Sequence, residues 1–144
     1  MMVLRVMAIL TVFAGCAMAA GSVTTGNTAT LSDAIDLVES GDYEEALVLL
    51  EDLNRRESGN PDTLNMLGYA SRLIGRFDDA FMWYGMALDL DPLHRGANEY
   101  LGELLLEVGD VAKARERLAA LDIACPDGCE ERDELAEAIA IATQ

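Results

Sequence analysis

A glycine recurs every 34 residues in the central part of the chain, at Gly41, Gly75 and Gly109. An alanine follows each glycine five residues later, and these alanines are Ala46, Ala80 and Ala114. A period of 34 residues is typical of helix-turn-helix units that stack because no unit can bury its apolar face alone. The spacing therefore predicts an all-α repeat array and favours a binding scaffold.

Apolar residues at helical spacing predict a pair of antiparallel helices in each repeat. The predicted repeats span residues 30–60, 61–94 and 95–126. Thr30 and Asn60 are of the residue types that cap helix N-termini, and Pro61 suits a first helical turn. A further amphipathic segment within residues 127–144 predicts a capping helix, which an open-ended stack needs to cover its last apolar face.

Small residues recur where paired helices would cross. Close packing of two helices requires small side chains at the contact. The second helices carry the three alanines of the period, and the first helices carry Ala34, Gly68 and Gly102. This spacing predicts closely packed helical hairpins.

The second repeat carries the fullest pattern of motif residues: Leu67-Gly68, Gly75, Phe77, Ala80, Tyr84, Ala87 and Asp91-Pro92. These residues resemble a tetratricopeptide repeat, and the resemblance extends over residues 27–126. The outer repeats match more loosely, with Asp33 where the family usually has leucine. The resemblance implies a right-handed superhelix of antiparallel hairpins and a concave groove that holds a peptide or a helix of a partner. It does not imply catalysis.

The groove positions of the family can be transferred to this chain residue by residue. They are Leu31, Ile35, Val38, Asn65, Tyr69, Arg72, Glu99, Glu103 and Leu106. This surface changes from apolar to acidic along the array. Asn65, Tyr69 and Arg72 would hydrogen-bond an extended peptide, while Glu99 and Glu103 would pair with its basic side chains. The alternative is that these are ordinary solvated faces, or that the apolar residues of the first repeat pack under the preceding segment.

Residues 1–20 have the composition of a signal peptide. Arg5 is their only charge, and a short apolar run leads to the small residues Ala17-Met18-Ala19. We therefore expect an exported, periplasmic protein with a flexible leader at residues 21–29. The alternative is a lipoprotein anchored through Cys16, because Phe13-Ala14-Gly15-Cys16 is similar to a lipid-attachment box. The apolar run is too short to span a bilayer.

The chain is strongly acidic, with a formal net charge of -16. Such a charge would repel a phosphate backbone, which disfavours nucleic acid as a partner. The acidic residues are spread along the predicted helices. They indicate either a solvated surface or a surface that selects basic partners.

Cys125 and Cys129 flank a Pro-Asp-Gly turn that the repeat pattern does not explain. In an exported protein this spacing favours a disulfide, and the alternatives are a redox-active pair or a metal site. His94 is the only histidine, so we expect no metal site and no cofactor.

The sequence thus predicts a non-enzymatic adaptor of the bacterial cell envelope that holds a protein or peptide in its groove. The alternative function is thiol-disulfide or metal handling through Cys125 and Cys129. Self-association is a further hypothesis, because three repeats leave open ends.

Overall fold

The computed structural model describes residues 29–144, and within this range it contains seven α-helices and no strand. The helices are α1 (Leu31–Ser40), α2 (Tyr43–Arg56), α3 (Pro61–Leu73), α4 (Phe77–Leu90), α5 (Arg95–Glu107), α6 (Val111–Ala124) and α7 (Glu130–Ala142). The all-α fold predicted from the 34-residue period is confirmed. The predicted signal peptide, most of the leader and Cys16 lie outside the described residues.

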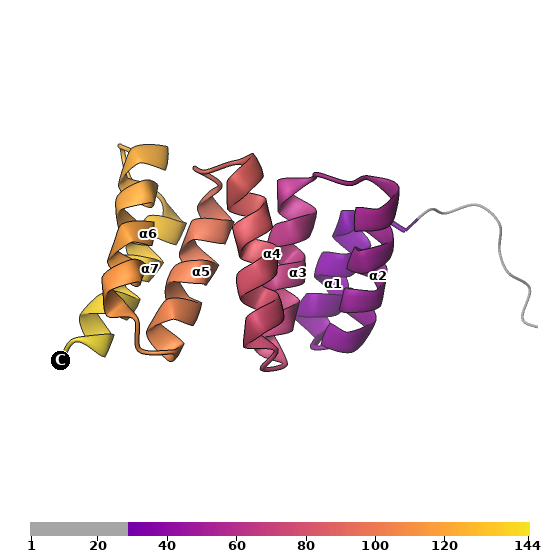
Figure 1. The fold of residues 1–144 in the computed structure, drawn as a ribbon, viewed down its shortest axis with the longest axis horizontal. Helices are drawn as coiled ribbons and strands as arrows, with labels where there is room; N and C mark the ends of the chain where they lie inside the picture. The colour runs from indigo at the N-terminus through magenta and orange to yellow at the C-terminus, as the bar shows by residue number, and fades with distance from the viewer. Residues whose placement is uncertain (1–28) are drawn as a thin grey trace, which may run out of the picture.

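The helices stand side by side in a row that runs from α1 and α2 at one end to α6 and α7 at the other (Figure 1). The first helices of the pairs, α1, α3 and α5, contact one another in sequence along one layer. The second helices, α2, α4 and α6, form the other layer, and α7 packs against both α5 and α6. No helix within residues 29–144 is long and apolar enough to cross a membrane.

Side chains predicted to cap helices do so. The Thr30 hydroxyl accepts a hydrogen bond from the Asp33 N–H, and the Asp33 carboxylate accepts one from the Thr30 N–H at 2.7 Å. The Asn60 side-chain oxygen accepts from the next two free N–H groups of α3, with Pro61 in the first turn. These bonds satisfy donors that a helix N-terminus otherwise leaves unpaired.

The turns that carry the 34-residue period share one geometry. Gly41, Gly75 and Gly109 have φ angles of 85°, 77° and 84°, a left-handed conformation that glycine adopts without steric cost. In each turn the residue after the glycine donates its N–H to a carbonyl five residues earlier, at 2.9, 2.9 and 2.7 Å. This bond closes the helix C-terminus, so the period in the sequence is a period of helix-ending turns.

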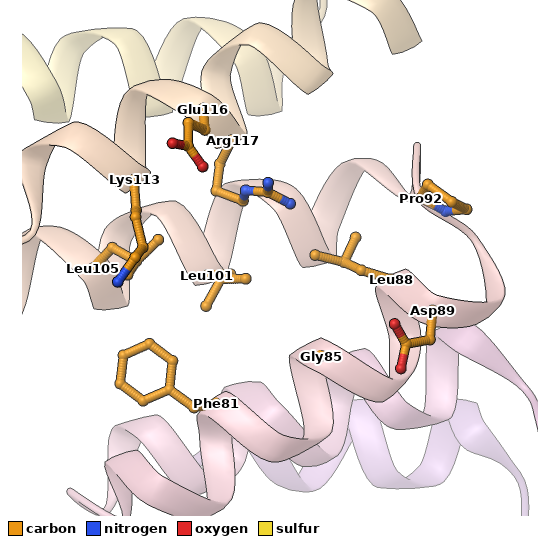
Figure 2. Close-up of a pocket in the computed structure, with 10 residues that line it drawn as sticks. All are labelled: Phe81, Gly85, Leu88, Asp89, Pro92, Leu101, Leu105, Lys113, Glu116 and Arg117. Carbon is orange, nitrogen blue, oxygen red and sulfur yellow. The ribbon is translucent and has the colours of Figure 1, made fainter.

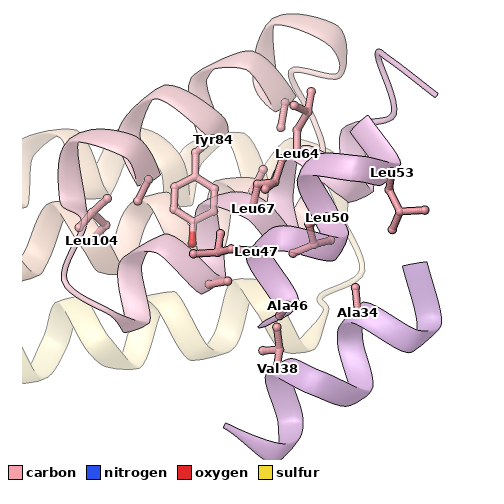
Figure 3. Close-up of a cluster of buried hydrophobic side chains, with 14 residues drawn as sticks. Ala34, Val38, Ala46, Leu47, Leu50, Leu53, Leu64, Leu67, Tyr84 and Leu104 are labelled. Atoms are coloured by element: carbon pink, nitrogen blue, oxygen red, sulfur yellow. The ribbon is translucent and has the colours of Figure 1, made fainter. Parts of the chain in front are cut away.

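Buried apolar side chains form two clusters. The larger cluster runs from α1 to α5 and includes Leu50, Leu67 and Tyr84 (Figure 3). Tyr84 packs directly over Gly68, where an added Cβ would lie 2.6 Å from the ring. The absence of a side chain at Gly68 therefore lets α3 and α4 approach closely, as the small-residue spacing predicted.

The smaller cluster joins α5, α6 and α7 through Leu105, Ala114, Leu121, Leu135 and Ile139. Here the small residue of the first helix faces a different element. A Cβ added at Gly102 would lie 2.5 Å from Leu135, which belongs to α7 rather than to α6. The third repeat therefore uses its glycine to bring α7 close to α5.

Candidate functional site

The nine predicted groove residues all lie on the first helices, three each on α1, α3 and α5. We call the surface formed by α1, α3, α5 and the adjoining side of α7 the first-helix face. On α1, Val38 is buried in the larger cluster, while Leu31 and Ile35 are half-buried. The first repeat therefore contributes a largely apolar and partly covered surface to this face.

Neighbouring repeats meet on this face through pairs of side chains on α3 and α5 that are 31 or 35 positions apart. The rings of Tyr69 and Tyr100 lie with their centroids 4.5 Å apart and their planes tilted by 36°. Arg72 binds Glu103 through Nη1 at 2.5 Å and Glu107 through Nε at 2.6 Å. Tyr100 and Glu107 were not among the predicted groove residues.

Arg72 is held tightly on the first-helix face. Its side chain is 14% exposed, and burial by itself would oppose its charge. Hydrogen bonds to Glu107 and Glu103 outweigh this effect and raise the pKa of Arg72 above its ordinary value. Arg72 and Glu103 are thus engaged with each other before any partner binds.

Asn65 is less accessible than a groove position was expected to be. It is buried, and its Nδ2 lies 2.9 Å from the point that a Cβ at Gly96 would occupy. The start of α5 therefore covers Asn65, because Gly96 has no side chain to hold the backbone away.

Glu99 also differs from the open position expected from the sequence. It is 3% exposed. Burial, together with a hydrogen bond and charge repulsion from Glu134 of α7, raises the pKa of Glu99 to about 9. Burial and the neighbouring Glu134 carboxyl both favour the neutral form of Glu99. Because α7 packs over this part of α5, Glu99 is also covered from a basic side chain of a partner.

A hollow of about 390 Å³ remains open on the first-helix face between α5 and α7. It is lined by Arg72, Glu103, Leu106, Glu107, Ala138, Ile141 and Ala142. Leu106 was predicted to lie in the groove, whereas the α7 residues were not. Ile141 is 63% exposed, and an unpartnered isoleucine in a predicted capping helix was the signal available in the sequence.

A second hollow of about 480 Å³ lies on the other side of α5, between α4 and α6 (Figure 2). Its floor is apolar and includes Phe81, Leu101 and Leu105. Charged side chains of α6, among them Lys113 and Arg117, lie above this floor in the figure. The 34-residue pattern does not predict this hollow, because its walls come from helices of two different repeats.

The two cysteines that flank the turn between α6 and α7 form a disulfide, with Cα atoms of Cys125 and Cys129 5.9 Å apart. His94 caps α5, since its Nδ1 accepts a hydrogen bond from the Ala97 N–H at 3.1 Å. Among residues 29–144 no group of three or more His, Cys, Asp or Glu side chains is arranged to hold a metal ion. The redox and metal-handling alternatives stay predictions.

Comparison with known proteins yields structural likenesses only. No family model and no curated protein matches the chain. One similar structure is that of the Yersinia enterocolitica type III secretion translocator chaperone SycD. The two chains align over 78% of this chain and 80% of SycD, with 21% identity and a TM-score of 0.70. A second SycD structure, described as an alternative dimer, has 20% identity, a TM-score of 0.70 and coverages of 78% and 88%.

A third similar structure is MamA RS-1, in a form described as the ArsTM double mutant. It has 27% identity and a TM-score of 0.63, and the alignment covers 83% of this chain and 73% of the MamA chain. The likeness to SycD and MamA, together with the repeated turns and paired helices, supports a tetratricopeptide-like helical fold for this chain.

Proposed function

We propose that this protein is a non-enzymatic scaffold of the bacterial cell envelope that holds a segment of a partner protein on its first-helix face. The observation that carries the proposal is the hollow between α5 and α7, where exposed apolar surface meets fixed charges. Leu106 and Ile141 supply the apolar contacts, and the Arg72–Glu103 pair borders them. Apolar surface rimmed by polar groups is characteristic of protein interaction sites.

The similar structures support a protein-binding role. SycD is named as a chaperone for secretion translocators, and both it and MamA share the helical architecture of this chain. The partner segment suited to this face is apolar where it meets Leu106. It is basic where it passes the exposed carboxylate of Glu107, which already shares Arg72 with Glu103.

Residues 1–20 support the cellular location in this proposal. Their single charge, short apolar run and small residues have the form of an export signal. An exported scaffold would find its partner among other envelope proteins. Anchoring through a lipid on Cys16 is the alternative, and mass spectrometry of the mature protein would distinguish an acylated Cys16 from a chain that begins after it.

The test uses a pair of matched variants near the end of α5. Leu106→Glu places a charge in the hollow, whereas Val108→Glu places one on an exposed position two residues away. Affinity capture from the native envelope with wild type identifies a partner, and calorimetry with that purified partner then compares the variants. We expect Leu106→Glu to weaken binding by about tenfold or more. Equal binding by both variants, with unchanged helical circular dichroism, would exclude the first-helix face as the site that binds the partner.

Self-association stays a prediction. Light scattering at two protein concentrations measures it directly. The average molar mass of a self-associating protein rises with concentration, whereas that of a monomer stays constant.

A further inference from the structure

The hollow between α4 and α6 faces away from the first-helix face. Leu101 and Leu105 belong to its apolar floor, and each lies two residues from Glu103 along α5, which is about 200° around the helix. Helices α4 and α6 are not packed against each other in the described chain, so the hollow stays open between them (Figure 2). A ligand bound here would not compete directly with one on the first-helix face.

The floor of this hollow is a seam between the two apolar clusters. Phe81 and Leu101 contact both clusters and remain half-buried. Gly85 adds to the open space, because no atom lies within 4 Å of the position its Cβ would take. An apolar side chain inserted at this seam would complete the burial of residues that the fold leaves partly exposed.

Arg117 supplies a positive charge at this hollow that forms no ion pair within residues 29–144. Three arginines of the described chain are half-buried, and two of them, Arg72 and Arg132, bind carboxylates. Arg117 has no carboxylate within 4.0 Å among residues 29–144, and its Nη1 donates to Asn98 Oδ1 at 3.3 Å. Asn98 is fully buried and donates to the carbonyls of Pro92 and His94. The guanidinium is therefore positioned by the core rather than by another charge.

We propose that the hollow between α4 and α6 binds a segment of a partner protein that places a large apolar side chain over Leu101 and a carboxylate against Arg117. The cavity volume lies within the range of about 300–1,000 Å³ found for ligand sites. A guanidinium that lacks a carboxylate partner favours an acidic group in the segment.

The rim selects a peptide rather than a simple alkyl carboxylate. Asp89 on the α4 side and Glu116 with Lys113 on the α6 side present both signs of charge around the apolar floor. A peptide can meet such a rim with its own polar groups, whereas an alkyl chain cannot. Asp89 and Glu116 also repel acidic groups elsewhere in the hollow, which directs the carboxylate toward Arg117.

The charge requirement is tested with two synthetic peptides, acetylated and amidated, that carry leucines along one helical face. One has glutamates beside the leucines, and the other has glutamines in their place. Titrations of the full chain followed by backbone amide NMR should show binding of the glutamate peptide, with shifts at Phe81, Leu101 and Arg117. We expect the glutamine peptide to bind about tenfold more weakly.

Two variants of α6 serve as a matched pair. Arg117→Gln removes the positioned charge and should weaken binding of the glutamate peptide by about tenfold. Arg115→Gln removes an exposed charge two residues away and should leave the affinity unchanged. Equal binding of the two peptides by wild type, or equal losses in the two variants, would overturn the proposal.

The location is tested by filling the hollow. Gly85→Leu introduces a side chain into open space on a helix, where replacing glycine favours the helical backbone. We expect this variant to lose binding of both peptides at unchanged helical circular dichroism, while Gly85→Ala retains it.

Loss of peptide binding in Leu106→Glu but not in Gly85→Leu would place the peptide on the first-helix face. Binding of dodecanoate at these residues without binding of either peptide would assign the hollow to a lipid. Either result would overturn the present inference, and neither would contradict the scaffold function proposed above.

Discussion

The two halves of the molecule follow the same 34-residue period but pack differently. In the second repeat, Gly68 of α3 meets Tyr84 of α4, so the contact that the period predicts is made within one hairpin. In the third repeat, Gly102 of α5 meets Leu135 of α7, which lies beyond the hairpin. Equal spacing in the sequence therefore ensures equal turns, but it does not ensure equal tertiary contacts.

This difference follows from the side chain available on the second helix. Tyr84 is long enough to fill the space beside Gly68 and is completely buried. Leu118 occupies the corresponding place 34 residues later, is smaller and stays half-buried. The space beside Gly102 is filled by α7 instead. The N-terminal half is thus held by an extended core, and the C-terminal half depends on its last helix.

Truncation of these two equivalent residues tests the comparison most strongly. Tyr84→Ala should reduce the free energy of unfolding by about 4 kcal/mol, because it removes a fully buried aromatic ring from the larger cluster. Leu118→Ala should cost about 1 kcal/mol, since a half-buried leucine loses less contact. Urea denaturation followed by circular dichroism measures both. Similar losses in the two variants would show that the halves are equally packed.

The disulfide should stabilise only the C-terminal half. Closing the short loop between Cys125 and Cys129 contributes about 2 kcal/mol in the chain-entropy treatment. We expect reduction to lower the hydrogen-exchange protection of α6 and α7 while α3 and α4 keep theirs. The double variant Cys125→Ser, Cys129→Ser should behave like the reduced protein and should not respond to reductant. An equal loss of protection in α3 and α4 would mean that the two halves unfold as one unit.

The sequence predicted the repeated features well because they arise from local chemistry. Thr30, Asn60 and Gly75 act on backbone groups within a few residues, so their types and spacing suffice to predict helix ends. All nine groove residues lie on the predicted first helices for the same reason.

The accessibility of the predicted groove residues was less predictable. Asn65 and Glu99 are covered because neighbouring helices approach at Gly96 and along α7. These approaches depend on contacts across repeats, which the period within a repeat does not specify. The hollow at Arg117 was missed for the same reason, since it requires α4, α5 and α6 together.

The effect most specific to the packing of α7 on α5 is a pH dependence that arises at Glu99. Burial and the nearby carboxyl of Glu134 raise the pKa of Glu99 to about 9, compared with 4.5 for an ordinary glutamate. At a pH between these two pKa values, Glu99 has lost its proton in the unfolded chain but keeps it in the folded protein. The free energy of unfolding should therefore fall as the pH rises from about 4.5 to about 9.

Glu99→Gln preserves the shape of the side chain without a titrating proton. At each pH we compare the free energy of unfolding of Glu99→Gln with that of wild type. This difference should favour the variant by at least about 1 kcal/mol more at pH 8 than at pH 5, since one unit of pKa shift corresponds to about 1.4 kcal/mol. Urea denaturation at the two pH values provides the measurement, and Glu137→Gln, on an exposed position of α7, is the control. If wild type and Glu99→Gln changed in parallel with pH, Glu99 would be ionised in the folded protein. The contact of α7 with α5 would then be looser than the structure shows, and the C-terminal half would have an open face where Glu99 could meet a basic partner.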